Sequence, residues 1–258
     1  MAEKFAIITG ASTGIGFELA TLAAKNGYDI LVVANESLIQ SAAQDFRQFG
    51  TDVQAVEADL STIDGVDRLL AAAGDRPIDL LCANAGKGLG RGFLDQEVAD
   101  WRRVVDTNVT GTIYLLQKVL KQMVARKSGN VLITGSIAGL LPGAYQAVYN
   151  ATKAYLDSFS YALREELKDS GVTITVLMPG PTDTPFFERA GMMDTPVGKD
   201  DSKEDPAKTA RNGWDAVMAG SAHVVSGAKN KLQAAISHVT PDSVLAKMHT
   251  NMAKPDGE

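Results

Sequence analysis

Short runs of apolar and β-branched residues recur along the chain, and segments with helical apolar spacing separate them. The first run, residues 5–9, ends in glycines and is followed over residues 15–25 by apolar positions at helical intervals. Similar runs cover residues 30–34, 53–57, 78–83, 130–134, 173–178 and 223–226. Near-continuous apolar strands of this length are typical of a parallel sheet that helices cover on both faces. The pattern therefore predicts an α/β fold with a doubly wound parallel sheet, in a single domain over residues 1–258.

One region inside the domain departs from this alternation. Residues 185–206 are rich in Met, Gly and charged residues, and we interpret residues 185–215 as a substrate loop or lid. Residues 199–206 are predicted to be a solvated stretch. The helix after it is expected to start with Asp205 as N-cap and Pro206 at the first helical position.

The C-terminal extension, residues 228–258, carries a second helical pattern. Residues 229–239 and 241–252 are predicted to form two short amphipathic helices. We expect them to pack on this subunit or on a partner. A substrate cap and a membrane-surface role are the alternatives, although few basic residues accompany the helices.

Composition favours small-molecule chemistry. The 258 residues are 45% hydrophobic and 22% charged, with a net charge of −6 and no long basic run, which argues against nucleic acid as a partner. The single cysteine, Cys82, is expected to fill the core, and His223, His238 and His249 have no tight ligand spacing, so we expect no metal site. The sequence MAEK leads directly into an apolar run, and no stretch of about 18 apolar residues follows. A cytoplasmic protein without stable membrane insertion is therefore predicted.

A glycine-rich turn follows the first apolar run. Gly10, Gly14 and Gly16 stand where the chain must turn and enter a helix, so backbone amides there can face a phosphate, and the Ser12 hydroxyl could add a contact. An ordinary glycine-containing loop between a strand and a helix is the alternative. The position after the first strand of an alternating chain favours a nucleotide site.

Tyr149 and Lys153 form the most informative pair in the chain. Their i, i+4 spacing places phenol and ammonium on one helical face. A cation about 4 Å from the phenolate, at an effective dielectric of about 20, is worth roughly 4 kcal/mol, or about three pKa units. The pair is therefore predicted to lower the tyrosine pKa into the range of a working acid or base. A solvated polar pair is the alternative. Ser136 lies 13 residues before Tyr149 and directly follows the run 130–134, where its hydroxyl could hold a substrate oxygen.

Asn108 lies in a helical pattern, VVDTNVTGTIYLL, that Asn, Thr, Gly and β-branched residues make locally poor. The composition predicts a kink or bulge there. An exposed polar position is the alternative reading of Asn108.

Together these motifs resemble the short-chain dehydrogenases/reductases over about residues 5–227, and they occur in that family's order. They are TGASTGIG from Thr9, ANAG at 83–86, Asn108, Ser136, YNATK at 149–153 and PGPTDT at 179–184. The resemblance implies a Rossmann-like sheet of about seven strands and an NAD(P)-dependent oxidoreductase that interconverts a carbonyl and an alcohol. It also implies a homodimer or homotetramer assembled through the long helices near Asn108 and Tyr149.

The resemblance assigns roles to individual residues. Tyr149 would be the general acid/base, Ser136 would hold the substrate oxygen, Lys153 would also contact the nicotinamide ribose, and Asn108 would hold a water that relays protons. Asp59 would meet the adenine amino group, with a helix N-cap as its alternative. Ala83 stands where the family more often has Asn. The expected cofactor-binding residues are Gly10, Ser12, Thr13, Gly14, Ile15, Gly16, Asn35, Asp59, Leu60, Asn84, Ala85, Gly86, Tyr149, Lys153, Pro179, Gly180, Thr182 and Thr184.

The choice between NAD(H) and NADP(H) depends on the end of the second strand. Ala34 stands where NAD-preferring relatives carry Asp, Asn35 where NADP-preferring ones carry Arg, and Thr13 where others add a basic residue. The uncharged Ala34 leaves a 2′-phosphate unopposed, which favours NADP(H) weakly, whereas Glu36 argues for NAD(H).

Residues expected at the substrate pocket are mostly apolar: Leu140, Leu141, Tyr145, Gln146 and the segments 87–93 and 186–193. A fairly hydrophobic ketone or secondary alcohol is predicted, and core packing of the same residues is the alternative. Two other functions use the same fold: a nucleotide-binding redox sensor without turnover, and an NAD-dependent epimerase or lyase. A sensor has no need of Ser136, Tyr149, Lys153 and Asn108 together, which favours the oxidoreductase.

Overall fold

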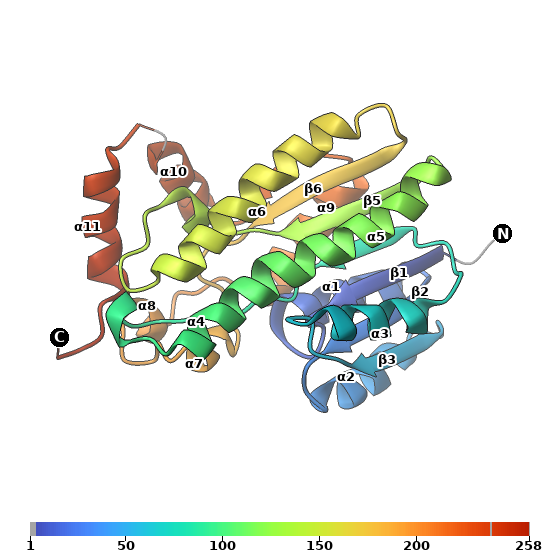
Figure 1. Ribbon diagram of the computed structural model, residues 1–258, viewed down its shortest axis with the longest axis horizontal. Coiled ribbons are helices and arrows are strands. Elements are labelled where there is room, and N and C mark those ends of the chain that lie inside the picture. Colours follow the sequence, from blue (N-terminus) through green and yellow to red (C-terminus); the bar gives the residue numbers. More distant parts are fainter. Residues whose placement is uncertain (1–3, 238, 258) are drawn as a thin grey trace.

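Seven parallel strands form one sheet at the centre of the computed structural model, which describes residues 4–237 and 239–257 (Figure 1). Their order across the sheet is β3-β2-β1-β4-β5-β6-β7, and all neighbours pair in parallel. The predicted single-domain, Rossmann-like sheet is confirmed, and each predicted run coincides with a strand. The strands are β1 (Lys4–Thr9), β2 (Tyr28–Ala34), β3 (Val53–Glu57), β4 (Leu80–Ala83), β5 (Gly129–Thr134), β6 (Val172–Met178) and β7 (His223–Val225).

Helices cover both faces of the sheet, and the side chains of its central strands are therefore buried on both sides. In β1, Ala6 and Ile8 point into one apolar cluster, whereas Phe5 and Ile7 point into the other. The first cluster lies under α1 (Gly14–Lys25), α2 (Leu38–Arg47) and α9 (Pro206–Met218). The second lies under α3 (Ile63–Ala73), α5 (Thr112–Ala125) and α6 (Ala147–Glu166), and Figure 1 shows α5 and α6 running side by side across this face.

The helix before α5 is interrupted as predicted. A π-helical turn, η2 (Asp106–Gly111), separates α4 (Val98–Val105) from α5 and contains Asn108. Asn108 is 1% exposed, so the alternative of an exposed polar position is wrong. π turns widen a helix by one residue and are frequent at functional sites.

The ends of the central strands are tied together by Asn84, which follows β4. Its amide donates to Thr9 O at 3.1 Å and accepts from Thr134 Oγ1 at 3.1 Å. The carboxyl ends of β1, β4 and β5 are thereby fixed relative to one another. The strand order reverses between β1 and β4, which is where open α/β sheets bind ligands.

Two C-terminal helices, α10 (Ala228–Ser237) and α11 (Asp242–Ala253), lie beyond one end of the sheet (Figure 1), which confirms the predicted pair. His238, part of the first predicted helix, lies outside the described residues. Residues 1–3, part of the N-terminal sequence MAEK, lie outside them as well. Among the described helices, none is long and apolar enough to cross a membrane.

The segment between β6 and α9 passes over the carboxyl ends of the central strands. It contains α7 (Phe186–Arg189) and α8 (Pro196–Lys199), and Asp205 caps α9 by accepting from Ala207 N at 2.8 Å, as predicted. From Pro206 on, the predicted lid is core helix. The expectation of a solvated stretch over 199–206 is wrong at Glu204. Its carboxylate points inward and accepts from Ser226 Oγ at 2.5 Å, because that buried hydroxyl offers it a partner.

Candidate active site

One large cleft, of about 1490 Å³, runs along the carboxyl ends of the strands. It gathers seventeen of the predicted cofactor residues together with Ser136, whereas Gly16 and Asn108 do not line it. The predicted residues that line it are Gly10, Ser12, Thr13, Gly14, Ile15, Asn35, Asp59, Leu60, Asn84, Ala85, Gly86, Ser136, Tyr149, Lys153, Pro179, Gly180, Thr182 and Thr184.

The glycine turn has the shape that a phosphate group requires. Gly10 and Gly14 have φ angles of 65° and 59°, which favour glycine, and a Cβ on Gly16 would collide with Gly10 O. The close approach that Gly16 permits brings the start of α1 to the strand end. The first amides of α1 have no carbonyl partner within the helix and lie at the cleft, as in an anion-binding helix terminus. The turn therefore fits a dinucleotide pyrophosphate.

Ser136 is held rigidly at the end of β5. Its Oγ accepts from Ala138 N at 3.0 Å and donates to Pro179 O at 3.3 Å, so it caps the short helix η3 (Ile137–Leu140) and contacts the segment after β6. The hydroxyl is buried but lines the cleft. A substrate oxygen that enters the cleft can reach it.

Tyr149 and Lys153 lie on α6 as predicted, with Lys153 Nζ 5.9 Å from the centre of the Tyr149 ring. The ammonium donates to Thr134 O at 2.8 Å. The expected fall of the tyrosine pKa is not found. Burial raises the pKa of Tyr149 to about 12, opposed by the neighbouring Ser136 hydroxyl, and burial lowers the pKa of Lys153 to about 8. The expectation fails because both groups are inside the protein, where desolvation of the phenolate outweighs the opposing effect of Ser136, and the Lys153 ammonium is bound to a backbone carbonyl.

Both the oxygen and the nitrogen of the Asn108 side-chain amide form hydrogen bonds to neighbouring segments. Nδ2 donates to Lys87 O at 3.0 Å and to Thr152 Oγ1 at 2.9 Å, and Oδ1 accepts from Lys87 N at 2.7 Å. It therefore joins the segment after β4 to α6. A Cβ on Gly86 would lie 3.5 Å from both Asn108 Oδ1 and Lys153 Nζ, so both side chains border Gly86.

At one end of the cleft, Asp59 accepts from Ser61 N at 3.1 Å and pairs with Arg103 at 2.7 Å. The alternative role of Asp59 as a helix N-cap is wrong, because Thr62 caps α3 by accepting from Gly65 N at 3.0 Å. Arg103 also lines the cleft. Sequence reasoning missed it because nothing local connects α4 to the end of β3.

Glu36 and Arg189 meet across the same end of the cleft. Glu36, two residues after β2, accepts from Ser12 Oγ at 2.5 Å and pairs with Arg189 at 3.0 Å. Arg189 comes from α7, so the segment after β6 reaches over the cleft to the glycine turn. This pairing joins positions 153 residues apart and had no signal in the sequence.

The other end of the cleft is mostly apolar. The Phe186 ring lies 5.2 Å from the Tyr149 ring, and Leu141, Gln146, Phe187 and Val197 complete the wall. Only part of each predicted pocket segment lines the cleft: Lys87 and Gly88 of 87–93, and Phe186, Phe187 and Arg189 of 186–193. Of the single residues predicted there, Leu140 and Tyr145 lie elsewhere. Leu140, the last residue of η3, lines a separate hollow, and Tyr145, in the following turn with a φ of 63°, packs in the cluster of Phe187 and Met192.

The helix α11 supplies residues that the sequence did not place at the site: His249, Asn251, Met252 and Ala253. His249 is buried, and its Nδ1 lies 2.8 Å from Ala144 O. Burial lowers the pKa of His249, so the neutral ring donates from Nδ1 to that carbonyl. The extension thus caps the apolar end, which was one of its alternative roles.

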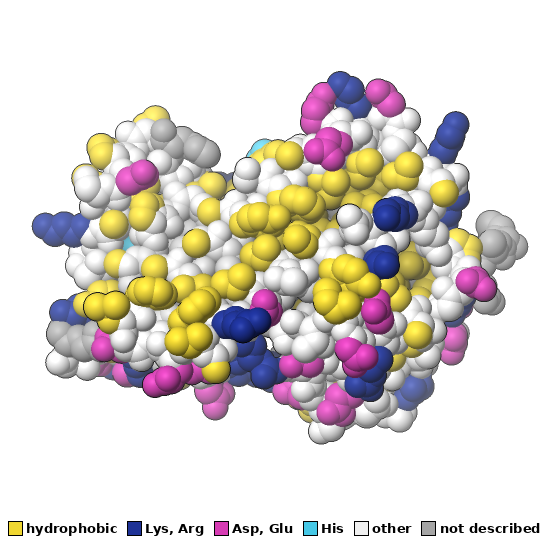
Figure 2. Space-filling view, viewed as in Figure 1, with side chains coloured by type: hydrophobic (Ala, Val, Ile, Leu, Met, Phe, Trp, Pro, Cys, Tyr) yellow, Lys and Arg dark blue, Asp and Glu magenta, His cyan; other side chains and the backbone are white. Residues whose placement is uncertain are grey.

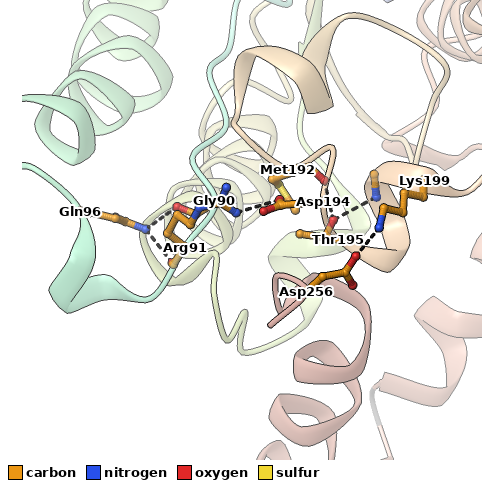
Figure 3. A network of polar contacts seen from close by, with 9 residues as sticks. Gly90, Arg91, Gln96, Met192, Asp194, Thr195, Lys199 and Asp256 are labelled. Carbon is orange, nitrogen blue, oxygen red and sulfur yellow. Dashed lines mark hydrogen bonds and ion pairs between the residues drawn. The ribbon is translucent and has the colours of Figure 1, made fainter. Parts of the chain in front are cut away.

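Polar contacts hold this cap in place, as Figure 3 shows. Lys199 pairs with Asp256, whose backbone N donates to Asp194 O at 3.0 Å, and Asp194 pairs with Arg91 at 2.9 Å. Three segments, from β4, from β6 and from the C-terminus, are therefore joined around the apolar end. We call this set of contacts the clasp.

Metal-ligating residues do not gather anywhere in residues 4–237 and 239–257: no group of three or more His, Cys, Asp or Glu could hold an ion. The described site offers hydroxyl, phenol and ammonium groups beside a phosphate-shaped turn. Such a set suits proton transfer next to a bound dinucleotide.

Comparison with known proteins agrees with this architecture. Residues 4–194 match the family described as short chain dehydrogenase. An uncharacterized oxidoreductase of Staphylococcus epidermidis is 35% identical over 189 residues, 72% of this chain and 81% of that protein. Because the family match spans most of the chain, the protein belongs to the short-chain dehydrogenase family, and it is an oxidoreductase of that family.

Two solved structures show how closely the fold is shared. A short-chain dehydrogenase from Sphingobium yanoikuyae in complex with NADPH is 25% identical, with a TM-score of 0.82 over 92% of this chain and 94% of that one. A short-chain dehydrogenase/reductase from Burkholderia phymatum in complex with NAD is 22% identical, with a TM-score of 0.83 over 93% and 95% of the two chains. The second likeness concerns the fold alone.

Proposed function

We propose that this protein is an NAD(P)-dependent oxidoreductase that interconverts a carbonyl and a secondary alcohol, with Tyr149 as the general acid/base. The observation that carries the proposal is the convergence of Ser136, Tyr149 and Lys153 in one cleft with a phosphate-shaped glycine turn. The relative that binds NADPH supports a nicotinamide cofactor, which supplies or accepts the hydride.

In the direction of carbonyl reduction, the Ser136 hydroxyl holds the substrate oxygen and the Tyr149 phenol donates a proton to it. A pKa of about 12 keeps Tyr149 protonated at neutral pH, ready to act as the acid. The Lys153 ammonium then lies near the phenolate that forms and stabilises its charge. In alcohol oxidation the same groups act in reverse. Asn108 positions the segment around Lys153, and a water relay at this point remains part of the proposal.

The predicted cofactor residues divide the cleft between them. The glycine turn would hold the pyrophosphate, and Asp59 and Leu60 the adenine. Residues 84–86 would contact the adenosine ribose. Residues 182–184, which follow Pro179 and Gly180 after β6, would contact the nicotinamide carboxamide. Lys153 would reach the nicotinamide ribose, since its Nζ lies at the cleft wall.

We favour NADP(H) as the preferred cofactor. Glu36 would repel a 2′-phosphate, but Arg189 pairs with it at 3.0 Å and supplies a guanidinium at the same place. Arginine is the side chain best suited to form bidentate hydrogen bonds with a phosphate. Asn35, beside Glu36, adds an uncharged amide. A higher kcat/KM with NADH than with NADPH would contradict this preference.

The substrate is proposed to be a fairly hydrophobic ketone or secondary alcohol. Phe186, Phe187, Val197 and Met252 give the end of the cleft beside Tyr149 an apolar wall. Apolar walls with a few placed polar groups are typical of small-molecule sites. Activity confined to small charged oxo-acids would contradict it.

A homodimer or homotetramer is proposed through the face of α5 and α6. Figure 2 shows apolar side chains gathered over the middle of this face. Exposed apolar side chains on these helices include Val124 on α5, Tyr155 on α6 and Val98 on α4. Light scattering on the purified protein tests the proposal, and a monomer at micromolar concentration would contradict it.

The test of the function is a panel of hydrophobic and charged ketones and alcohols, run with NADPH and NADH and followed through the absorbance of the reduced cofactor. We expect stoichiometric cofactor oxidation with hydrophobic ketones. Tight cofactor binding without turnover of any compound would favour a redox sensor, and product without net cofactor change would favour an epimerase or lyase.

A further inference from the structure

A buried carboxylate with no role in the reaction described above lies directly behind the catalytic residues. Asp157 is on α6, one turn after Lys153 and two turns after Tyr149, and it is 5% exposed. Within the described residues neither carboxylate oxygen has a hydrogen-bond partner. An unpaired buried carboxylate costs several kcal/mol, so its retention needs a physical reason.

The carboxylate is wedged against the turn that carries Ser136. A Cβ on Gly135 would collide with Asp157 Oδ1, and a Cβ on Gly139 would collide with Oδ2. The backbone amide of Ser136 also faces the carboxylate and helps to lower its pKa, although its geometry falls short of a hydrogen bond. Asp157 therefore contacts the turn on both sides of the catalytic serine.

The titratable groups around Asp157 come from three elements. Tyr149, Lys153 and Tyr161 are on α6, His223 is on β7 and Lys231 is on α10. Of these, Lys153 is the buried cation, and its attraction lowers the pKa of Asp157, which burial has raised to about 7. The negative charge acts in return on both neighbours, since it raises the pKa of Lys153 and that of Tyr149.

We infer that Asp157 is a positioning residue for the reaction: it braces the Gly135–Gly139 turn that presents Ser136, and its charge keeps the Lys153 ammonium protonated inside the protein. The catalytic part of this inference rests on the proposed function. The electrostatic part concerns the lysine alone and can be measured without a substrate.

The experiment compares Asp157→Asn, which keeps the shape and removes the charge, with Glu166→Gln, which removes an exposed charge from the same helix. The ¹³Cε chemical shift of Lys153, assigned by its loss in Lys153→Arg, is followed by NMR from pH 6 to pH 10. We expect the titration midpoint of Lys153 to fall by about one unit or more in Asp157→Asn and to stay unchanged in Glu166→Gln. A midpoint that stays at the wild-type value in Asp157→Asn would overturn the inference.

Turnover on a ketone found in the panel gives the second readout. The alkaline limb of the pH profile of kcat/KM should move to lower pH in Asp157→Asn, because loss of the charge lowers the pKa of both Lys153 and Tyr149. A structural role alone would scale the rate equally at every pH. Should Asp157→Asn fail to fold, Asp157→Ser removes the same charge with less bulk. If no ketone reacts, the proposed function fails, whereas the lysine titration still decides the role of Asp157.

Discussion

The buried carboxylate of Asp157 should make the stability of the protein fall as the pH rises towards neutrality. Burial raises its pKa from 3.8 to about 7, so between these values the folded protein binds a proton that the unfolded chain has released. The free energy of unfolding therefore decreases with rising pH in this window. The difference of about three pKa units corresponds to about 4 kcal/mol in total, of which about 2.5 kcal/mol falls between pH 5 and pH 8. Lys153, with a pKa of about 8, opposes this change by only about 0.4 kcal/mol up to pH 8.

Urea unfolding at pH 5, 6, 7 and 8 measures this effect through the fluorescence of Trp101 and Trp214. Other carboxylates titrate in the same range, so the quantity to compare is wild type minus Asp157→Asn. We expect the wild type to lose at least about 2.5 kcal/mol relative to the variant between pH 5 and pH 8, because the lower pKa expected for Lys153 in the variant adds to the difference. The reasoning is refuted if the difference between the two proteins is constant across this range, since the carboxylate would then titrate alike in both states.

Three further changes test separate parts of the site. Arg189→Ala should lower kcat/KM with NADPH by about 10- to 100-fold, the value of one charged hydrogen bond, and affect NADH far less; Arg211→Ala, an exposed arginine outside the cleft, is the control, and equal losses with both cofactors would contradict the assignment. Gly16→Ala should weaken binding of the reduced cofactor more than tenfold in a fluorescence titration, because the new methyl group collides with Gly10 O; unchanged affinity would refute this. Asp256→Ala removes the ion pair with Lys199, one contact of the clasp, whose two partners are exposed. It should therefore raise KM by no more than about fivefold and leave kcat unchanged, and the difference from wild type should disappear at high salt. A large fall in kcat would contradict the view that the clasp only holds the cap in place.

Local patterns in the sequence were enough for the sheet and its helices. Near-continuous apolar runs identify the seven strands, since both faces of a parallel sheet are buried. Poor helix formers around Asn108 predict a kink or bulge, which the structure shows to be a π turn. The same is true of the cap at Asp205, which depends on neighbours in the chain. The alternation and the glycine turn also fix where the strand ends meet, which is why most predicted cofactor residues line one cleft.

Contacts between distant segments could not be predicted in this way. Arg189 meets Glu36, Arg103 meets Asp59, and α11 brings His249 to the substrate end, all by folding rather than by spacing. The predicted fall of the Tyr149 pKa was wrong for a related reason. Spacing indicates that a lysine is near, whereas the degree of burial depends on everything packed around the pair, and burial dominates here.

The central claim is that Tyr149 transfers the proton, and the replacement Tyr149→Phe tests it most directly. The matched control is Tyr155→Phe, an exposed phenol on the same helix. The account predicts that kcat for a reactive ketone falls by at least about 100-fold in Tyr149→Phe, while the cofactor Kd is nearly unchanged and Tyr155→Phe behaves as wild type. Turnover by Tyr149→Phe at the rate of Tyr155→Phe would contradict it.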